Sequence, residues 1–164
     1  MTGSILQINV SPGGVPKFPI REGRVTRLGI EGDGHRNPEF HGGPTRALLM
    51  ICSEVIEALI REGYPLFYGA LGENITTRGV DHLQMRTGQR YRLGEVVIEL
   101  TKVRTPCTQL DVYGPSIKAA IYDKRVKAED SSSPRWAMSG FYSSVVQTGV
   151  IRQDDIIALV DHVV

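Results

Sequence analysis

Cys107 is the side chain whose type and position in this sequence most favour chemistry. It follows residues 96–101, where apolar and β-branched residues alternate at period two as in a strand. Pro106 cannot donate a hydrogen bond to a sheet, so the strand must end there or lie at an edge. Arg104 brings a positive charge that favours the thiolate, the form that binds metals and acts as a nucleophile. The alternative is a small buried core residue, because free cysteine is often buried.

A second group of candidate residues lies in and just after the glycine-rich segment 31–45. A stretch of this length without regular structure is usually functional or disordered. Adjacent glycines let the backbone approach a ligand closely and present N–H groups to an anion, and an arginine can bind phosphate through two hydrogen bonds. The alternative is a glycine turn with solvated charges. The candidates here are Asp33, His35, His41, Gly42, Gly43 and Arg46.

Glu73 and Asn74, at the start of a β-prone run, form a third candidate group. Both side chains can accept hydrogen bonds from ring amino groups, and the alternative is an Asx turn. Together with a thiolate at Cys107, the three groups predict a site for a soft metal such as copper, zinc or cluster iron. Zinc bound by His35, His41 and Cys107 is a rival interpretation, although the short paired ligand spacing of structural zinc sites is absent from the sequence.

Composition narrows the class of protein. The 164 residues have the length of a single domain, and a net charge of +1 provides no general field to attract nucleic acid or an anionic membrane. Two cysteines, Cys52 and Cys107, make neither a disulfide framework nor a zinc finger, which favours a reducing cytoplasm. The sequence shows no secretion signal and no run of about 18 apolar residues, so we expect no membrane association.

The elements that must position these residues are mostly strands. Six to eight are expected, and breaker-rich segments between them favour turns. Because the strands do not alternate regularly with helices, the pattern favours a mostly antiparallel β-barrel over a doubly wound sheet. The predicted strands cover residues 5–10, 23–30, 47–52, 75–77, 91–93, 96–101, 141–148 and 156–160.

Few helices are expected. Residues 53–63 form the clearest one, with Ser53 as N-cap and Gly63 just beyond its end. Residues 115–122 predict a second, shorter helix. The polar, serine-rich residues 124–135 predict a mobile loop, and residues 149–155 predict a turn.

Four ordered motifs resemble those of the MOSC domain, the C-terminal domain of molybdenum cofactor sulfurases. The resemblance runs from about residue 10 to residue 159 and includes residues 139–142. Asp154 stands where the family usually has glycine before its final strand, and the extra C-terminal helical region of longer bacterial members is missing. The motifs are Gly32-Asp33-Gly34-His35, residues 41–47 (His-Gly-Gly-Pro-Thr-Arg-Ala), residues 69–79 (Gly-Ala-Leu-Gly-Glu-Asn-Ile-Thr-Thr-Arg-Gly) and Arg104-Thr105-Pro106-Cys107.

The resemblance implies a MOSC-type β-barrel with a few peripheral helices that binds molybdenum cofactor, a pterin (molybdopterin) with a terminal phosphate. It implies that Cys107 either ligates molybdenum or carries sulfur as a persulfide. Lys17 and Arg46 would suit the pterin phosphate. The residues expected to contact the cofactor are Lys17, Asp33, His35, His41, Gly42, Gly43, Arg46, Glu73, Asn74 and Arg104.

The resemblance leaves three functions open. The first is reduction of N-hydroxylated compounds, with electrons from separate flavin and iron–sulfur proteins, because the chain has no ferredoxin-type cysteines. The second is a sulfur carrier for cofactor or metal–sulfur cluster assembly, loaded by a cysteine desulfurase. Pyridoxal phosphate is expected only in such a separate partner. The third is a module that holds the cofactor without doing chemistry.

Overall fold

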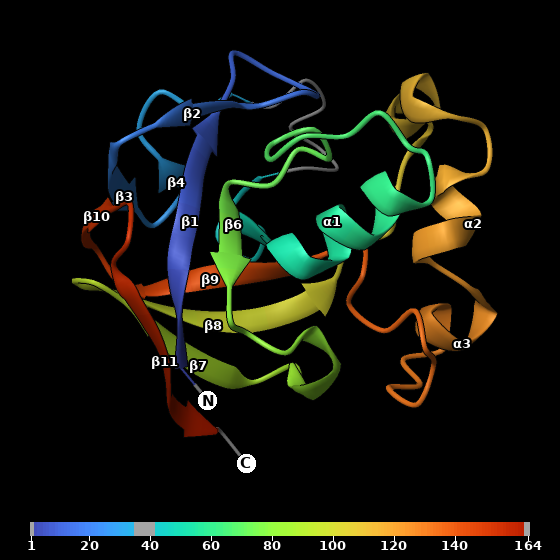
Figure 1. Ribbon diagram of the computed structural model, residues 1–164. Helices are drawn as coiled ribbons and strands as arrows, with labels where there is room; N and C mark the ends of the chain where they lie inside the picture. The colour runs from blue at the N-terminus through green and yellow to red at the C-terminus, as the bar shows by residue number, and fades with distance from the viewer. Residues whose placement is uncertain (1, 35–41, 163–164) are drawn as a thin grey trace.

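The computed structural model describes residues 2–34 and 42–162 and consists of a β-barrel with helices along one side (Figure 1). The strands are β1 (Thr2–Val10), β2 (Phe18–Ile20), β3 (Glu22–Thr26), β4 (Gly29–Ile30), β5 (Leu48–Cys52), β6 (Ile75–Arg78), β7 (Gln89–Leu93), β8 (Val96–Val103), β9 (Phe141–Gln147), β10 (Gly149–Arg152) and β11 (Ile156–His162). The α-helices are α1 (Ser53–Arg61), α2 (Ile117–Ile121) and α3 (Lys124–Lys127), and two 3₁₀ turns are η1 (His82–Gln84) and η2 (Thr108–Tyr113).

The barrel closes because β1 pairs with β11 as well as with β6. Its strands follow the order β11-β7-β8-β9-β5-β6-β1, with β2 added beside β1, and β10, β3 and β4 form a separate small sheet. Within the described residues only β5 and β6 pair in parallel. A parallel pair needs a crossover, which α1 supplies. The predicted mainly β, mostly antiparallel barrel with peripheral helices is therefore confirmed.

The fully buried strand β5 and the helix after it form the best-predicted part of the core. All five residues of Leu48–Cys52 are buried, as expected for a strand covered on both faces. Helix α1 covers the outer face with Val55, Ile56 and Leu59. Gly63 follows the helix with a φ of 105°, the left-handed conformation that glycine adopts at little cost. The N-cap prediction was wrong: Cys52 occupies that position without a side-chain bond, and Ser53 is the first helical residue.

Three segments differ from the sequence predictions. Residues 23–30 form two strands joined by a turn, β3 and β4, and residues 149–152 form β10, which pairs with β3 rather than making a turn. Residues 124–127 form α3 instead of a mobile loop. The carboxylate of Asp123 accepts a 2.8 Å hydrogen bond from the Val126 amide, and the Val126 side chain is buried. Such a cap offsets the unpaired amides at the start of even a short helix.

Within residues 2–34 and 42–162, no helix is both long and apolar enough to cross a membrane. Strands β7 and β8 pair antiparallel and form a hairpin. Strand β8 leaves the barrel at Val103 and leads directly to Arg104 and Cys107. These residues lie beside the end of the sheet, where the candidate site is found.

Candidate functional site

One pocket brings together residues from loops and strands that are far apart in the sequence. It is lined by Gly14, Val15, Lys17, Gly34, Gly42, Arg46, Leu49, Gly72, Asn74, Arg104, Cys107, Gln109 and Tyr142. Three of the described lining residues are cations, and none is a carboxylate. The space open to the centres of water molecules is about 50 Å³. One water needs about 10–15 Å³ of such space, so the cavity has room for a small anionic group.

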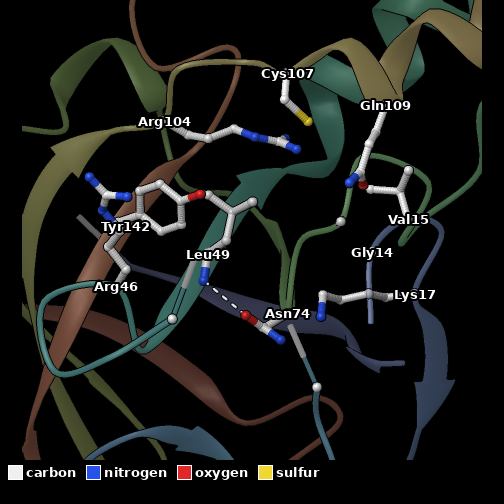
Figure 2. Close-up of a pocket in the computed structure, with 13 residues that line it drawn as sticks. Gly14, Val15, Lys17, Arg46, Leu49, Asn74, Arg104, Cys107, Gln109 and Tyr142 are labelled. Atoms are coloured by element: carbon white, nitrogen blue, oxygen red, sulfur yellow. Dashed lines mark hydrogen bonds between the residues drawn. The ribbon is translucent and has the colours of Figure 1, made fainter. Parts of the chain in front are cut away.

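Cys107 presents its sulfur to this pocket (Figure 2). The residue is half-buried and stands immediately before η2, where its carbonyl accepts a 3.2 Å hydrogen bond from the Leu110 amide. Cys52, in contrast, is 1% exposed, and burial raises the pKa of its thiol to about 12. A neutral, buried thiol is inert. Cys107 is therefore the cysteine available for metal binding or sulfur chemistry.

Arg104 points its guanidinium into the same space, below the Cys107 side chain in the view of Figure 2. Its backbone is fixed on both sides, because its amide donates to Gly140 at 2.8 Å and its carbonyl accepts from the Ser139 hydroxyl at 2.6 Å. The residue is 3% exposed, yet its Nε and Nη1 have no hydrogen-bond partner in the described part of the chain. Buried donors are normally paired, so these two N–H groups predict an anionic ligand.

Lys17, Asp33 and Asn74 form a buried network along one wall. The Lys17 Nζ lies 2.5 Å from Asp33 Oδ1, and the two side chains are 8% and 1% exposed. Asp33 Oδ2 accepts a 2.8 Å bond from Asn74 Nδ2, while Asn74 Oδ1 accepts a 3.0 Å bond from the Leu49 amide. Lys17 and Asn74 line the pocket, but Asp33 lies behind them. The sequence placed Asp33 among the ligand contacts, whereas the structure places it as the counter-ion of Lys17.

Glu73 lies behind the pocket wall rather than in it. Its side chain is fully buried, and Oε2 accepts bonds from the Gly69 amide at 3.0 Å and from the Thr76 hydroxyl at 2.9 Å. Burial raises the pKa of this carboxyl, and the nearby charge of Arg104 opposes that rise. The sequence predicted a contact between Glu73 and a cofactor. In the structure the Glu73 side chain is separated from the pocket by the residues that line it. The position instead makes Glu73 an internal neighbour of Arg104.

Arg46 and Tyr142 form another wall. The guanidinium carbon of Arg46 lies 5.6 Å from the centre of the Tyr142 ring, within the range of a cation–π interaction. Tyr142 is mostly buried, and this burial raises the pKa of its hydroxyl, which therefore stays neutral at physiological pH. Of the adjacent glycines, Gly42 lines the pocket and Gly43 does not.

His35 and His41 lie outside the described residues, and so does the predicted zinc site that depends on them. Among residues 2–34 and 42–162, no three His, Cys, Asp or Glu side chains gather closely enough to hold a metal. Among the described residues that line the pocket, the thiol of Cys107 is the side chain of a type that binds soft metals.

Sequence reasoning missed several lining residues, chiefly Gln109, Tyr142 and Gly72. Gln109 could have been found from its position two residues beyond Cys107. Gly72 has a φ of 88°, and a Cβ there would lie 2.9 Å from Val15 Cγ1 and 3.7 Å from Arg104 Nη2. Its lack of a side chain keeps the pocket open beside Arg104. Tyr142 belongs to the matching residues 139–142 but was not predicted to line the site, because its contact with Arg46 depends on the pairing of β9 with β5.

Solved structures similar to this one extend over nearly the whole chain. YiiM from Escherichia coli superposes with a TM-score of 0.72 at 24% identity, covering 99% of this chain and 71% of that one. YiiM from Geobacillus stearothermophilus gives 0.68 at 26% identity, with coverage of 97% and 75%. A hypothetical protein gives 0.76 at 26% identity, with coverage of 99% and 70%.

Curated relatives show the same relationship in sequence. Protein YiiM of Escherichia coli is 34% identical over 108 residues, which cover 62% of this chain and 48% of that protein. The uncharacterized protein YflK of Bacillus subtilis is 29% identical over 141 residues, covering 83% and 58%. The chain therefore spans about half the length of the curated relatives it matches. The model of the MOSC domain matches residues 37–158, which is well over half of the chain. The chain belongs to the MOSC domain family.

Proposed function

We propose that this chain binds molybdenum cofactor in the pocket at Cys107, with the Cys107 sulfur as metal ligand, and reduces N-hydroxylated compounds. One observation carries the proposal: a half-buried thiol and a buried guanidinium with unpartnered N–H groups face the same pocket. A thiolate suits a soft metal, and a guanidinium suits an anion. Membership of the MOSC domain family is consistent with cofactor binding.

The lining residues fit such a ligand. Arg104 and Arg46 provide positive charge for a phosphate, whereas the charge of Lys17 is already balanced by Asp33. Gly72 leaves room beside Arg104. The cavity, at about 50 Å³, takes a small anionic group and not a pterin ring system, so most of a bound cofactor would extend beyond it. The proposal therefore assigns the buried cations to the charged end of the ligand.

When bound, the cofactor supplies a metal centre that transfers electrons. Reduction of an N–OH group to N–H consumes an electron pair and two protons and releases water. The electrons would come from separate flavin and iron–sulfur proteins. The residues of this chain would hold the ligand: Cys107 binds the metal, Arg104 and Arg46 neutralise negative charge, and the neutral Tyr142 hydroxyl can hold a proton at its oxygen. A reducing cytoplasm, which keeps both thiols free, is part of this proposal.

Sulfur transfer is the second candidate function. A persulfide on Cys107 would be stabilised as an anion by Arg104, which lines the same pocket. The other cysteine, Cys52, is buried in the core and does not line that pocket, so it is not placed to displace the sulfur as a disulfide. Such a carrier would be loaded by a separate cysteine desulfurase, whose pyridoxal phosphate would stay in that partner. A module that only holds the cofactor would share the pocket without either reaction.

Metal and pterin analysis tests the proposal. The protein is purified from a host that makes molybdenum cofactor, and its molybdenum content and pterin fluorescence are measured. We expect both, in equal amounts. Protein that contains neither after purification, and takes up neither when mixed with released cofactor, would contradict cofactor binding.

Replacing Arg46 with alanine should weaken the binding of released molybdopterin by about 1.5–3 kcal/mol, the usual contribution of a hydrogen bond to a charged group. Fluorescence titration of the cofactor-free protein measures this change. Arg61→Ala, an exposed substitution in the last turn of α1, is the control and should leave the affinity unchanged. If the wild type and the Arg46 variant bind molybdopterin with equal affinity, Arg46 does not contact the anion.

A further inference from the structure

A second, larger cavity lies on the other side of the backbone segment that carries Cys107. Its volume is about 650 Å³, within the range of about 300–1,000 Å³ that is usual for binding sites. We call it the 103–105 groove. It is lined by Arg86, Thr87, Lys102, Val103, Thr105, Tyr122, Val126, Lys127, Ala128, Glu129, Ser131 and Trp136. The lining comes from the end of β8, from α3 and from the loops before β7 and after α3.

This groove shares a wall with the pocket that contains Cys107, which we call the cysteine pocket. Val103 and Thr105 line the groove, whereas Arg104 and Cys107 line the pocket. Val103 is the last residue of β8, and successive side chains along a strand point to opposite sides, which explains why Val103 and Arg104 line different cavities. The Thr105 and Tyr122 hydroxyls lie 3.4 Å apart and connect the wall to the segment after α2. A molecule in the groove would therefore contact the backbone segment that leads to Cys107, and this segment would separate it from the pocket.

The groove is positively charged. Its lining contains Arg86, Lys102 and Lys127 against a single carboxylate, Glu129. Lys102 and Lys127 are exposed, and neither forms an ion pair within the described residues. Arg86 is held in place, because it donates to the Leu83 carbonyl at 2.7 Å and lies over the Trp136 ring at 5.8 Å. The groove thus offers one fixed cation and two that are available to an incoming partner.

The distribution of apolar and polar groups favours a protein as that partner. Val103, Val126 and Trp136 are buried and form an apolar floor, while the lysines and Thr105 are exposed around it. An apolar centre with a polar rim is the usual arrangement of a protein interface. Exposed charges at a rim accelerate the approach of an oppositely charged partner.

We propose that the 103–105 groove binds an acidic surface of a separate protein that delivers electrons to the site at Cys107. This inference rests on the proposed reductase function, in which each turnover consumes an electron pair from outside the chain. The groove supplies the positive charge, and the shared wall places the partner next to the reacting site.

A short fluorescent peptide rich in aspartate and glutamate serves as the probe, and fluorescence anisotropy with the cofactor-free protein measures its affinity. The Lys102→Ala/Lys127→Ala variant should bind about five- to tenfold more weakly than the wild type, since each exposed charge pair contributes a factor of a few. The control is Lys118→Ala/Lys124→Ala. It changes the net charge equally, and Lys124 lies on α3 with Lys127, but neither residue lines the groove. Control affinity should be within about twofold of the wild type.

Three results would overturn the inference: no binding of the peptide, equal weakening by both variants, or equally tight binding of an oligonucleotide of the same charge, which would indicate a general polyanion surface. The molybdenum content of the groove variant separates this inference from the proposed function. It should equal that of the wild type, because the lysines do not line the cysteine pocket. Protein that contains molybdenum but does not bind the peptide would contradict only the docking site. Protein that binds the peptide but contains no molybdenum would contradict only the proposed binding of the cofactor.

Discussion

The Cys107→Ser variant is expected to lose reduction of N-hydroxylated compounds, or sulfur loading, completely while keeping its fold. Serine is nearly isosteric with cysteine, and Cys107 uses its backbone carbonyl to hold the Leu110 amide, which the substitution leaves unchanged. A hydroxyl is a poor ligand for a soft metal and cannot form a persulfide. Turnover with an artificial electron donor measures the loss, and the thermal midpoint of unfolding reports on the fold.

Cys52→Ala is the matched control for this substitution. Cys52 is 1% exposed in the core, so its truncation should lower the stability but leave turnover per folded molecule unchanged. Full activity of the serine variant would show that Cys107 is required for neither reaction. Mass spectrometry after incubation with a desulfurase and a sulfur donor separates the two chemistries. Added sulfur on Cys107 without bound molybdenum would favour the carrier, and molybdenum without added sulfur would favour the reductase.

Lys17→Met is expected to lower the free energy of unfolding by about 3–5 kcal/mol, the usual result of removing one partner from a buried ion pair. Asp33 is 1% exposed at its side chain, and among residues 2–34 and 42–162 it would keep only the Ser11 amide and the Asn74 side-chain amide as donors. A domain of ordinary stability has about 5–15 kcal/mol in total, so the variant should be close to unfolding at moderate temperature. Urea denaturation followed by circular dichroism measures the change.

Two further variants test the cause of that loss. Lys17→Met/Asp33→Asn removes both charges and should recover most of the stability, because no uncompensated charge remains buried. Arg152→Met breaks an ion pair with Glu22 whose side chains are 56% and 57% exposed, and it should cost less than about 1 kcal/mol. A Lys17→Met variant as stable as Arg152→Met would show that Lys17 and Asp33 are not a buried pair.

The sequence predicted the parts of the fold that depend on local patterns. The alternation in β8, the continuous apolar run of β5 and the apolar face of α1 each follow from a periodicity that one segment contains. Strand β10 and helix α3 were missed because the first depends on pairing with β3, far away in the sequence, and the second on a single capping aspartate. Strand β2 was missed because its proline is tolerated only at an edge.

The same division between local and distant interactions applies to the site. The motif from Arg104 to Cys107 could be recognised directly, since its residues are adjacent in the chain. The partner of Lys17 could not, because Asp33 reaches it only after β2, β3 and β4 have folded back. Glu73 was predicted as a ligand together with Asn74, because both side chains can accept hydrogen bonds from ring amino groups. In the structure Asn74 lines the pocket, whereas Glu73 is fully buried behind it and accepts hydrogen bonds from the Gly69 amide and the Thr76 hydroxyl.

X-ray absorption at the molybdenum edge tests most directly whether the Cys107 sulfur binds the metal. The wild-type protein and the Cys107→Ser variant are loaded with the same excess of cofactor, and the sulfur atoms bound to molybdenum are counted in each. Our account predicts one sulfur ligand more in the wild type than in the variant. Equal sulfur coordination in two samples that both hold molybdenum would contradict it.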